Sequence, residues 1–153
     1  MRIVMTLCVI HQEPKILLGL KKRGFGMGKW NGFGGKVKDG EDIIEAAKRE
    51  VLEETGVPVE NLEPSGKLEF NFEGNPDTIE VNLFRAMDFN GEPVESEEMR
   101  PQWFDVGGIP YDEMWPDDRH WLPLFLKGNK LYGKFLFDKK GNEVLKKELS
   151  VFT

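Results

Sequence analysis

Residues 35–57 read GKVKDGEDIIEAAKREVLEETGV, and this stretch predicts an α-helix from about Asp42 to Thr55. The helix begins at a possible capping box, in which Asp42 accepts hydrogen bonds from backbone N–H groups and Glu45 reaches back. Gly56 follows as a natural C′ glycine, because glycine adopts the left-handed conformation that ends many helices.

The glutamates near the end of this helix crowd one another. On a helical wheel, Glu50, Glu53 and Glu54 share an arc about 100° wide. Like charges three or four residues apart repel by roughly 0.2–0.5 kcal/mol per pair. A divalent cation would neutralise them, and carboxylate oxygens suit hard ions such as Mg²⁺ or Mn²⁺. The neighbouring apolar stripe is expected to face the core and consists of Ile44, Ala47 and Val51.

The helix alone leaves a plainer alternative, a solvated acidic face on which Glu45 and Glu53 each pair with Arg49, four residues away. The segment before the helix favours the metal site. Seven of the 17 glycines lie between Gly24 and Gly40, and glycine lets a backbone approach a ligand closely. A glycine-rich loop that leads into clustered acids is typical of a metal–phosphate site.

The spacing of residues 35–57 matches a known motif. It reads G-x5-E-x7-R-E-V-x-E-E-x-G-V, which resembles the Nudix box at every defined position. The resemblance implies a Nudix hydrolase, in which a metal-activated water attacks a phosphorus atom. It also implies the Nudix fold, an α+β fold in which a mixed β-sheet is packed between helices as an α/β/α sandwich.

The resemblance assigns roles to the residues of the box. The implied catalytic residues are Arg49, Glu50, Glu53 and Glu54. Glu53 is either a further metal ligand or the residue that activates water, and Arg49 orients the glutamates by salt bridges. Glu41 supports the loop. The implied ligands of Mg²⁺, for which Mn²⁺ is a possible substitute, are the carbonyl of Gly34 or Gly35, the side chains of Glu50, Glu53 and Glu54, and Glu98 from outside the helix.

The flanking segments carry a narrower resemblance. They are similar to Nudix enzymes of the MutT-homologue type, the oxidised purine nucleoside triphosphatases (8-oxo-dGTP diphosphatases). The similarity extends to about Phe137. It implies hydrolysis of 8-oxo-dGTP and 2-hydroxy-dATP to the monophosphate and pyrophosphate, which sanitises the nucleotide pool. The segments are GLKKRGFGMGKWNGFGGKV (19–37), FNFEGNP (70–76), PVESEEMRPQWF (93–104) and MWPDDRHWLPLFL (114–126).

Two adjacent acids in the last of these segments allow two interpretations. Asp117 and Asp118 precede a short predicted helix and could act as its N-terminal cap pair. Alternatively, they contact the edge of the base. Two close carboxylates in an apolar pocket ionise unequally, so that one donates a hydrogen bond while the other accepts. Moving a proton between them would suit bases with different edges, and the resemblance favours this second interpretation.

The resemblance implies further contacts with the substrate. Aromatic rings at Phe70, Phe72, Trp115 and Trp121 could stack on the base or simply fill the core, and the amide of Asn31 could read its edge. Glu98 could instead be a rim residue. His11 and His120 match no role and are interpreted as surface or incidental residues. The full set of implied substrate contacts is Thr6, Lys21, Phe25, Asn31, Phe33, Gly34, Gly35, Lys36, Phe70, Phe72, Met99, Trp115, Pro116, Asp117, Asp118 and Trp121.

The rest of the chain predicts one domain over residues 1–153 with many strands and a second helix. Apolar or alternating runs predict strands at 3–10, 15–20, 67–72, 79–84, 102–106, 130–137 and, less clearly, 143–152. The second helix is expected over residues 120–128, with Pro123 in its first turn, where proline is tolerated.

Composition narrows the class of protein. A net charge of −6 without a basic block argues against binding of a nucleic-acid polymer, and no apolar run approaches the roughly 20 residues of a membrane helix. Cys8 is interpreted as a core residue, and we expect a cytoplasmic monomer that acts on small nucleotides. Two alternatives stay open: a broader Nudix diphosphatase for methylated purine triphosphates or dinucleoside polyphosphates, and a non-catalytic nucleotide-binding module.

Overall fold

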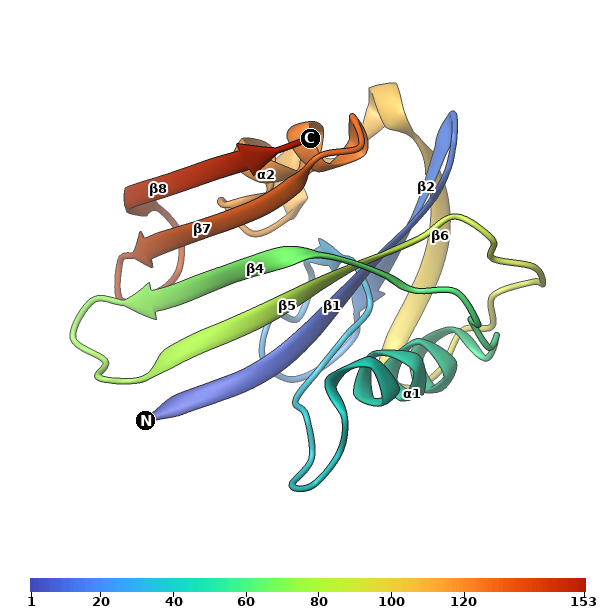
Figure 1. Ribbon diagram of the computed structural model, residues 1–153, viewed down its shortest axis with the longest axis horizontal. Coiled ribbons are helices and arrows are strands. Elements are labelled where there is room, and N and C mark those ends of the chain that lie inside the picture. Colours follow the sequence, from blue (N-terminus) through green and yellow to red (C-terminus); the bar gives the residue numbers. More distant parts are fainter.

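The computed structural model describes all residues from Met1 to Thr153, and its centre is an eight-stranded mixed sheet. The strands are β1 (Arg2–Gln12), β2 (Lys15–Lys21), β3 (Trp30–Asn31), β4 (Glu63–Phe72), β5 (Thr78–Ala86), β6 (Met99–Asp105), β7 (Lys130–Phe137) and β8 (Val144–Phe152). They lie in the order β3-β2-β1-β5-β4-β7-β8, and β6 pairs with β2. Figure 1 shows β8, β7, β4, β5 and β1 side by side.

Two pairs of strands are parallel, β1 with β5 and β4 with β7, and the other pairs are antiparallel. Parallel neighbours need long crossover connections. The two helices, α1 (Ile43–Thr55) and α2 (Asp118–Leu126), lie within these crossovers. Short 3₁₀ turns at Val106–Gly108 and Tyr111–Glu113 lead from β6 towards α2.

The helices cover opposite faces of the sheet, and each closes a separate hydrophobic core. Ala47 and Val51 of α1 pack with Cys8 and Ile10 of β1 in one core. The other core is formed by α2 and the second face of the sheet, through Val9, Leu68, Trp121, Leu122, Phe125 and Phe135. Strand β1 contributes to both cores, which explains its nearly continuous apolar sequence. The predicted α+β fold with an α/β/α sandwich is confirmed.

Helix α1 follows the sequence prediction in its extent but not in all details. Gly56 ends the helix with φ of 76°, and its N–H bonds to the carbonyl of Leu52, as predicted. The predicted capping box is wrong, because Asp42 makes no side-chain cap hydrogen bond and stays exposed, where water can satisfy the first turn. The prediction that Ile44 faces the core is also wrong, because Ile44 is 37% exposed. Ala46, which was not predicted on the apolar stripe, is buried beside Ala47.

Helix α2 begins earlier than predicted, so Pro123 lies in its interior and not in its first turn. Proline has no N–H for the carbonyl four residues before it, which here belongs to Arg119. Arg119 is exposed, so solvent can replace the missing partner.

Every predicted strand is present, with small shifts of its ends. The two-residue strand β3 is too short to leave an alternating pattern in the sequence. His11, interpreted as a surface or incidental residue, is instead buried near the end of β1. Neither helix is long and apolar enough to cross a membrane.

Candidate active site

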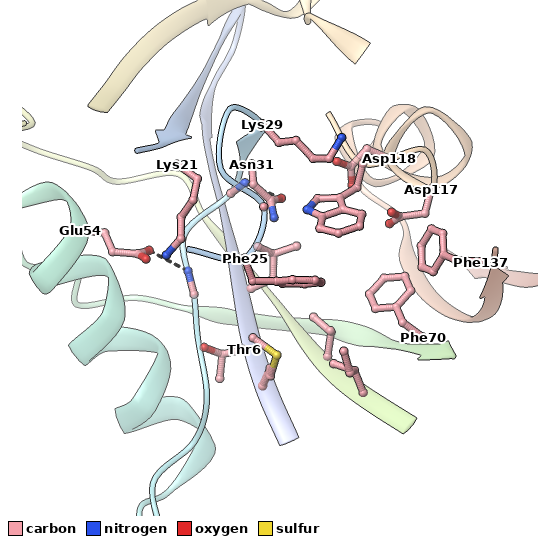
Figure 2. A pocket seen from close by; sticks show the side chains of 18 of the residues that line it. Thr6, Lys21, Phe25, Lys29, Asn31, Glu54, Phe70, Asp117, Asp118 and Phe137 are labelled. Carbon is pink, nitrogen blue, oxygen red and sulfur yellow. Dashed lines mark hydrogen bonds between the residues drawn. The ribbon is translucent and has the colours of Figure 1, made fainter. Parts of the chain in front are cut away.

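One cavity connects helix α1 with the start of α2, the two regions in which the sequence predicted functional residues. It has a volume of about 190 Å³ and is lined by Gly34 and Glu54 at one end and by Trp115, Asp117 and Asp118 at the other. Figure 2 shows Glu54 on α1 and the two aspartates near the start of α2 on opposite sides of this space. Because pockets that enclose a whole small molecule typically measure roughly 300–1,000 Å³, this cavity suits one ring system with the rest of a ligand outside.

At the α1 end, the glycine-rich loop and the helix meet through a buried carboxylate. The N–H of Gly34 donates to Glu54 Oε1 at 3.0 Å, the dashed contact in Figure 2. Glu54 is 8% exposed. Burial and then the charge of Glu50 raise the pKa of Glu54 to about 8, against the opposing effects of the Gly34 N–H and Lys21. The cavity therefore holds a buried carboxyl group whose ionised form is only partly compensated by Lys21 and the Gly34 N–H.

Arg49 ties the neighbouring acids together. Its guanidinium donates to both oxygens of Glu41, at 2.8 and 3.1 Å, and to the carbonyl of Lys36 at 3.1 Å. It also donates to Glu50 at 2.9 Å and to Glu53 at 3.4 Å. The bidentate contact lowers the pKa of Glu41 to about 2. Arg49 thus joins the loop before α1 to the acidic face of the helix.

Glu98 is held at the rim by cations. Its carboxylate pairs with Arg23 at 2.6 Å and with Lys21 Nζ at 3.7 Å. These contacts, the Arg23 hydrogen bond first, lower the pKa of Glu98. Lys21 itself lines the cavity, so the ammonium group lies between Glu98 and the buried Glu54.

At the α2 end, two adjacent carboxyl groups are buried together. Asp117 and Asp118 are 4% and 3% exposed. Burial raises the pKa of Asp117 to about 6, although the indole of Trp121 donates to its Oδ2 at 2.7 Å and favours the ionised form. Burial and then the charge of Asp117 raise the pKa of Asp118 well above its ordinary value. Asp118 therefore keeps its proton to a higher pH than Asp117.

The structure does not support the alternative role of the two aspartates as a helix cap. Asp117 occupies the N-cap position of α2 but makes no side-chain cap hydrogen bond. Its carboxylate is used by the indole of Trp121 instead.

Two buried polar atoms of the cavity lack a hydrogen-bond partner, Thr6 Oγ1 and Asp118 Oδ2. Buried polar atoms are nearly always paired, so such atoms in a cavity indicate a ligand that completes them. Asn31 is oriented by its own backbone, because its Oδ1 accepts from the N–H of Gly32 at 2.9 Å. The amide N–H₂ of Asn31 is left to donate into the cavity.

Aromatic rings form the walls between the two ends. Phe72 and Trp115 meet edge to face with centroids 6.3 Å apart, and Phe25 lies 5.1 Å from the Trp115 ring at a tilt of 36°. Phe70 packs against Phe137 deeper in the wall. Phe25 is 73% exposed although it lines the cavity. A flat aromatic ligand would cover this ring.

Comparisons with known proteins agree with this geometry. The NUDIX domain family matches residues 1–125. The chain belongs to the Nudix family. It is 50% identical over 142 residues to the oxidized purine nucleoside triphosphate hydrolase of Danio rerio, covering 93% of this chain and 90% of that protein. It is 52% identical over 132 residues to the protein of the same name from Mus musculus, covering 86% and 85%.

Solved structures share the fold of this Nudix hydrolase. The crystal structure of a mutator MutT protein from Bacillus halodurans superimposes with a TM-score of 0.84 at 29% identity and covers 97% of both chains.

Nudix hydrolases use a divalent metal, and the residues of this chain fit one. Carboxylates and a loop carbonyl are the oxygen ligands that hard cations prefer. The carbonyl of Gly34 accepts no backbone hydrogen bond, whereas that of Gly35 accepts from Thr6 N–H at 2.9 Å. The buried Glu54 carboxylate also needs a cation to be ionised near neutral pH. Gly34 is therefore the better candidate of the two loop carbonyls.

In this structure, however, the acids of α1 do not form a metal-binding cluster. No three acidic, histidine or cysteine side chains lie close enough together to hold a metal ion. Arg49 draws Glu50 and Glu53 to itself, while Glu54 turns to the N–H of Gly34. The convergence of these three carboxylates on a metal ion therefore stays a prediction.

Most of the residues that the sequence assigned to the substrate line the cavity. Those that do are Thr6, Lys21, Phe25, Asn31, Gly34, Phe70, Phe72, Met99, Trp115, Asp117 and Asp118. Five do not line it, and their contact with the substrate stays a prediction: Phe33, Gly35, Lys36, Pro116 and Trp121. Phe33 and Trp121 are fully buried in the two cores, and Trp121 reaches the cavity only through Asp117. The backbone of Gly35 packs against the carboxylate of Glu50.

Several cavity residues were missed by sequence reasoning. They are Met5, Leu7, Gly26, Lys29, Gly32, Val81 and Phe137. Strand alternation could have indicated part of this set, because Met5 and Leu7 lie on one face of β1 and Val81 on the same face of β5. Lys29 carries no such signal. Its Nζ lies 5.3 Å from the centroid of the Trp115 ring, a contact between segments far apart in the sequence.

Proposed function

We propose that this enzyme hydrolyses oxidised purine nucleoside triphosphates, such as 8-oxo-dGTP and 2-hydroxy-dATP, to the monophosphate and pyrophosphate in a Mg²⁺-dependent reaction. The observation that carries the proposal is the single cavity that reaches from the Nudix helix to a buried pair of aspartates. Its relatives from Danio rerio and Mus musculus, named for oxidised purine nucleoside triphosphates, support the same substrate class.

At the α1 end, we assign Gly34, Glu50, Glu53 and Glu54 to Mg²⁺, with Mn²⁺ as a possible substitute and Glu98 as a further acid at the rim. Such an ion neutralises phosphate charge and lowers the pKa of bound water. Glu53 is the most exposed of the three helix acids, at 55% of its side chain, so it is the one best able to accept a proton from an attacking water. Arg49 keeps the loop against the helix through Glu41 and the carbonyl of Lys36.

The ammonium of Lys21 supplies positive charge between the two ends. It lies in the cavity lining, on the side of Glu98 and Glu54. When the base occupies the small cavity, the triphosphate extends from it towards α1 and passes the ammonium group, which attracts the negative phosphates.

At the α2 end, the residues present a matched set of donors and acceptors to a purine. Asp118 retains its proton and can donate, while Asp117 is pinned by Trp121 and can accept. Asn31 donates its N–H₂, and the unpaired Thr6 hydroxyl faces the same space. Because a proton can move between two such carboxyl groups, the pair can meet both the 8-oxoguanine edge and the 2-hydroxyadenine edge.

The proposal is tested by a panel of oxidised, methylated and ordinary nucleoside triphosphates with Mg²⁺, in which pyrophosphate and orthophosphate are both quantified. We expect the highest kcat/KM for the oxidised purines, with pyrophosphate as the inorganic product. Highest activity on methylated purines or dinucleoside polyphosphates would replace this substrate class. Absence of hydrolysis across the panel would reject it.

We further propose that the enzyme acts as a cytoplasmic monomer on free nucleotides. The only cysteine, Cys8, is a buried thiol in the core, which suits a reducing compartment. Sedimentation of the purified protein at several concentrations tests the monomer, and a mass that rises with concentration would contradict it.

A further inference from the structure

The indole of Trp115 is held edgewise between two glycines from opposite ends of the chain. A methyl group at Gly26, in the loop between β2 and β3, would lie 3.4 Å from Trp115 Nε1. A methyl group at Gly141, in the turn between β7 and β8, would lie 2.7 Å from Trp115 Cζ3 and 3.1 Å from Phe72 Cε2. The opposite edges of the indole therefore each rest on a position without a side chain.

The turn that carries Gly141 is fixed by its own hydrogen bonds. The carboxylate of Asp138 accepts from the N–H groups of Asn142 and Glu143 at 2.7 and 3.1 Å. The N–H of Gly141 donates to the carbonyl of Asp138 at 3.1 Å. Gly141 is buried and has a φ of 75°, a conformation that favours glycine. These hydrogen bonds and the burial of Gly141 restrict the conformation of the turn.

The ring faces of Trp115 are used differently from its edges. Phe25 lies beside the ring at 5.1 Å and Lys29 Nζ lies 5.3 Å from its centroid. Figure 2 shows Phe25 projecting into the cavity between the Glu54 end and the aspartate end. A base that stacks in the cavity meets the face of the indole, so the contacts at the edges set the plane on which it stacks.

We infer that the turn Asp138–Glu143 of the C-terminal hairpin is part of the substrate-binding apparatus, and that Gly141 is a positioning residue which sets the plane of Trp115. This inference rests on the proposed function, since it assigns the stacking of the purine to that indole. The turn lies far from the Nudix box in sequence and contacts the cavity wall at Trp115 and Phe72. The binding of the base should therefore depend on the turn while the chemistry at α1 should not.

The test compares Gly141→Ala with the control Gly128→Ala. Gly128 has a φ of 97° and no atom within 4 Å of an added methyl group, so it carries similar backbone strain without the contact. We expect Gly141→Ala to raise KM for 8-oxo-dGTP about tenfold, because a displacement of about 1 Å in a positioned group has effects of this order or larger. We expect kcat and the Mg²⁺ activation curve to stay unchanged, because stacking acts equally on ground and transition states. Gly128→Ala should change none of these.

A double-mutant cycle separates positioning from general loosening of the fold. Phenylalanine lacks the Cζ3 edge of the indole, so in a Trp115→Phe background the added methyl group of Gly141→Ala keeps only its contact with Phe72 and should raise KM less than it does beside the indole. An equal rise in both backgrounds, or equal KM values for Gly141→Ala and Gly128→Ala, would overturn the inference. If Gly141→Ala does not fold, Asp138→Ala, which frees two N–H groups of the turn, should give the same selective rise in KM, and an unchanged KM there would overturn the inference as well.

The proposed function and this inference fail in different ways. A wild-type enzyme that does not hydrolyse 8-oxo-dGTP refutes the proposed substrate, and the same cycle is then run with the purine nucleotide of highest kcat/KM. A wild-type enzyme that hydrolyses 8-oxo-dGTP while the Gly141 variant keeps its KM refutes only the role of the turn.

Discussion

The two acidic ends of the cavity contain the same functional group in opposite settings. At α1, Arg49 bonds to Glu41, Glu50 and Glu53 and only Glu54 is deeply buried. At α2, both carboxyl groups are buried, and the closest donor is the neutral indole of Trp121. Arg49 lowers the pKa of Glu41 at the α1 end, whereas burial raises the pKa values of Glu54, Asp117 and Asp118.

This difference indicates different ligands for the two ends. Several carboxyl groups around a loop carbonyl suit a cation and, through it, a polyphosphate. A buried pair with unequal pKa values suits the edge of a neutral base, because it offers one donor and one acceptor. Partners and burial, more than residue type, decide what each acid does.

The largest effect is expected from removing charge at the α1 end. Glu54→Gln keeps an amide oxygen that can accept from Gly34 N–H, so the loop should stay in place. The lost negative charge should reduce kcat on the order of 10²-fold. Steady-state kinetics with Mg²⁺, together with a thermal unfolding curve, measures both parts of this prediction.

Glu45→Gln is the matched control, because Glu45 lies on the same helix but is exposed and contacts no other charged group of the site. It should retain wild-type turnover. A Glu54→Gln enzyme that turns over normally would mean that the α1 end does not perform the chemistry, and the contrast between the two ends would disappear.

A smaller and different effect is expected at the α2 end. Asp117→Asn can no longer exchange a proton with Asp118, so it should fit one base edge at the expense of the other. We expect the ratio of kcat/KM values for 8-oxo-dGTP and 2-hydroxy-dATP to change about tenfold, the size of one hydrogen-bonding difference in base recognition. The concentration of Mg²⁺ for half-maximal activity should not change.

Asp112→Asn provides the comparison, since Asp112 is exposed and pairs only with Arg119 at 3.0 Å, outside the cavity. It should leave the substrate ratio as in the wild type. Equal losses on both substrates in Asp117→Asn would show that the pair does not read the base edge.

The sequence was sufficient for the α1 end because its chemistry is local. The spacing of the box and the C′ glycine place Arg49 and the glutamates on one helix, and periodicity predicted Ala47 and Val51 in the core. It failed at Ile44 because a helical wheel cannot tell where the sheet ends under a helix. It could not show that Arg49 hydrogen bonds to both Glu41 and Glu50, because these contacts depend on how the loop folds against the helix.

The α2 end could be predicted only in part, because it is assembled from distant segments. Adjacency suggested a coupled pair at Asp117 and Asp118, but the contact with Trp121 depends on the true start of α2. The edges of Trp115 contact Gly26 and Gly141, which are far apart in the sequence. His11 was misjudged for the same reason, since its partner at 2.8 Å is the buried Arg85 of β5.

The smallest effect distinguishes Asp117 from Glu41 by the pH dependence of the free energy of unfolding. The pKa of Asp117 is raised from 3.8 to about 6, so between these values the unfolded chain loses its proton first. The free energy of unfolding therefore falls as pH rises from about 4 to 6. Glu41 has the opposite sign, because a pKa lowered to about 2 makes its contribution appear as pH rises from about 2 to 4.5.

Urea unfolding of the wild type and Asp117→Asn across pH 4 to 8 isolates the aspartate contribution. The free energy of unfolding of Asp117→Asn should rise relative to that of the wild type as pH increases from about 4 to 6. The reason is that asparagine, unlike the buried aspartate, cannot ionise. His11, whose pKa is lowered by burial and Arg85, adds an opposing rise near pH 6 in both proteins and cancels in the difference. A difference that stays constant with pH would show that burial does not raise the pKa of Asp117, and the assignment of Asp117 and Asp118 as a coupled donor–acceptor pair would then fail.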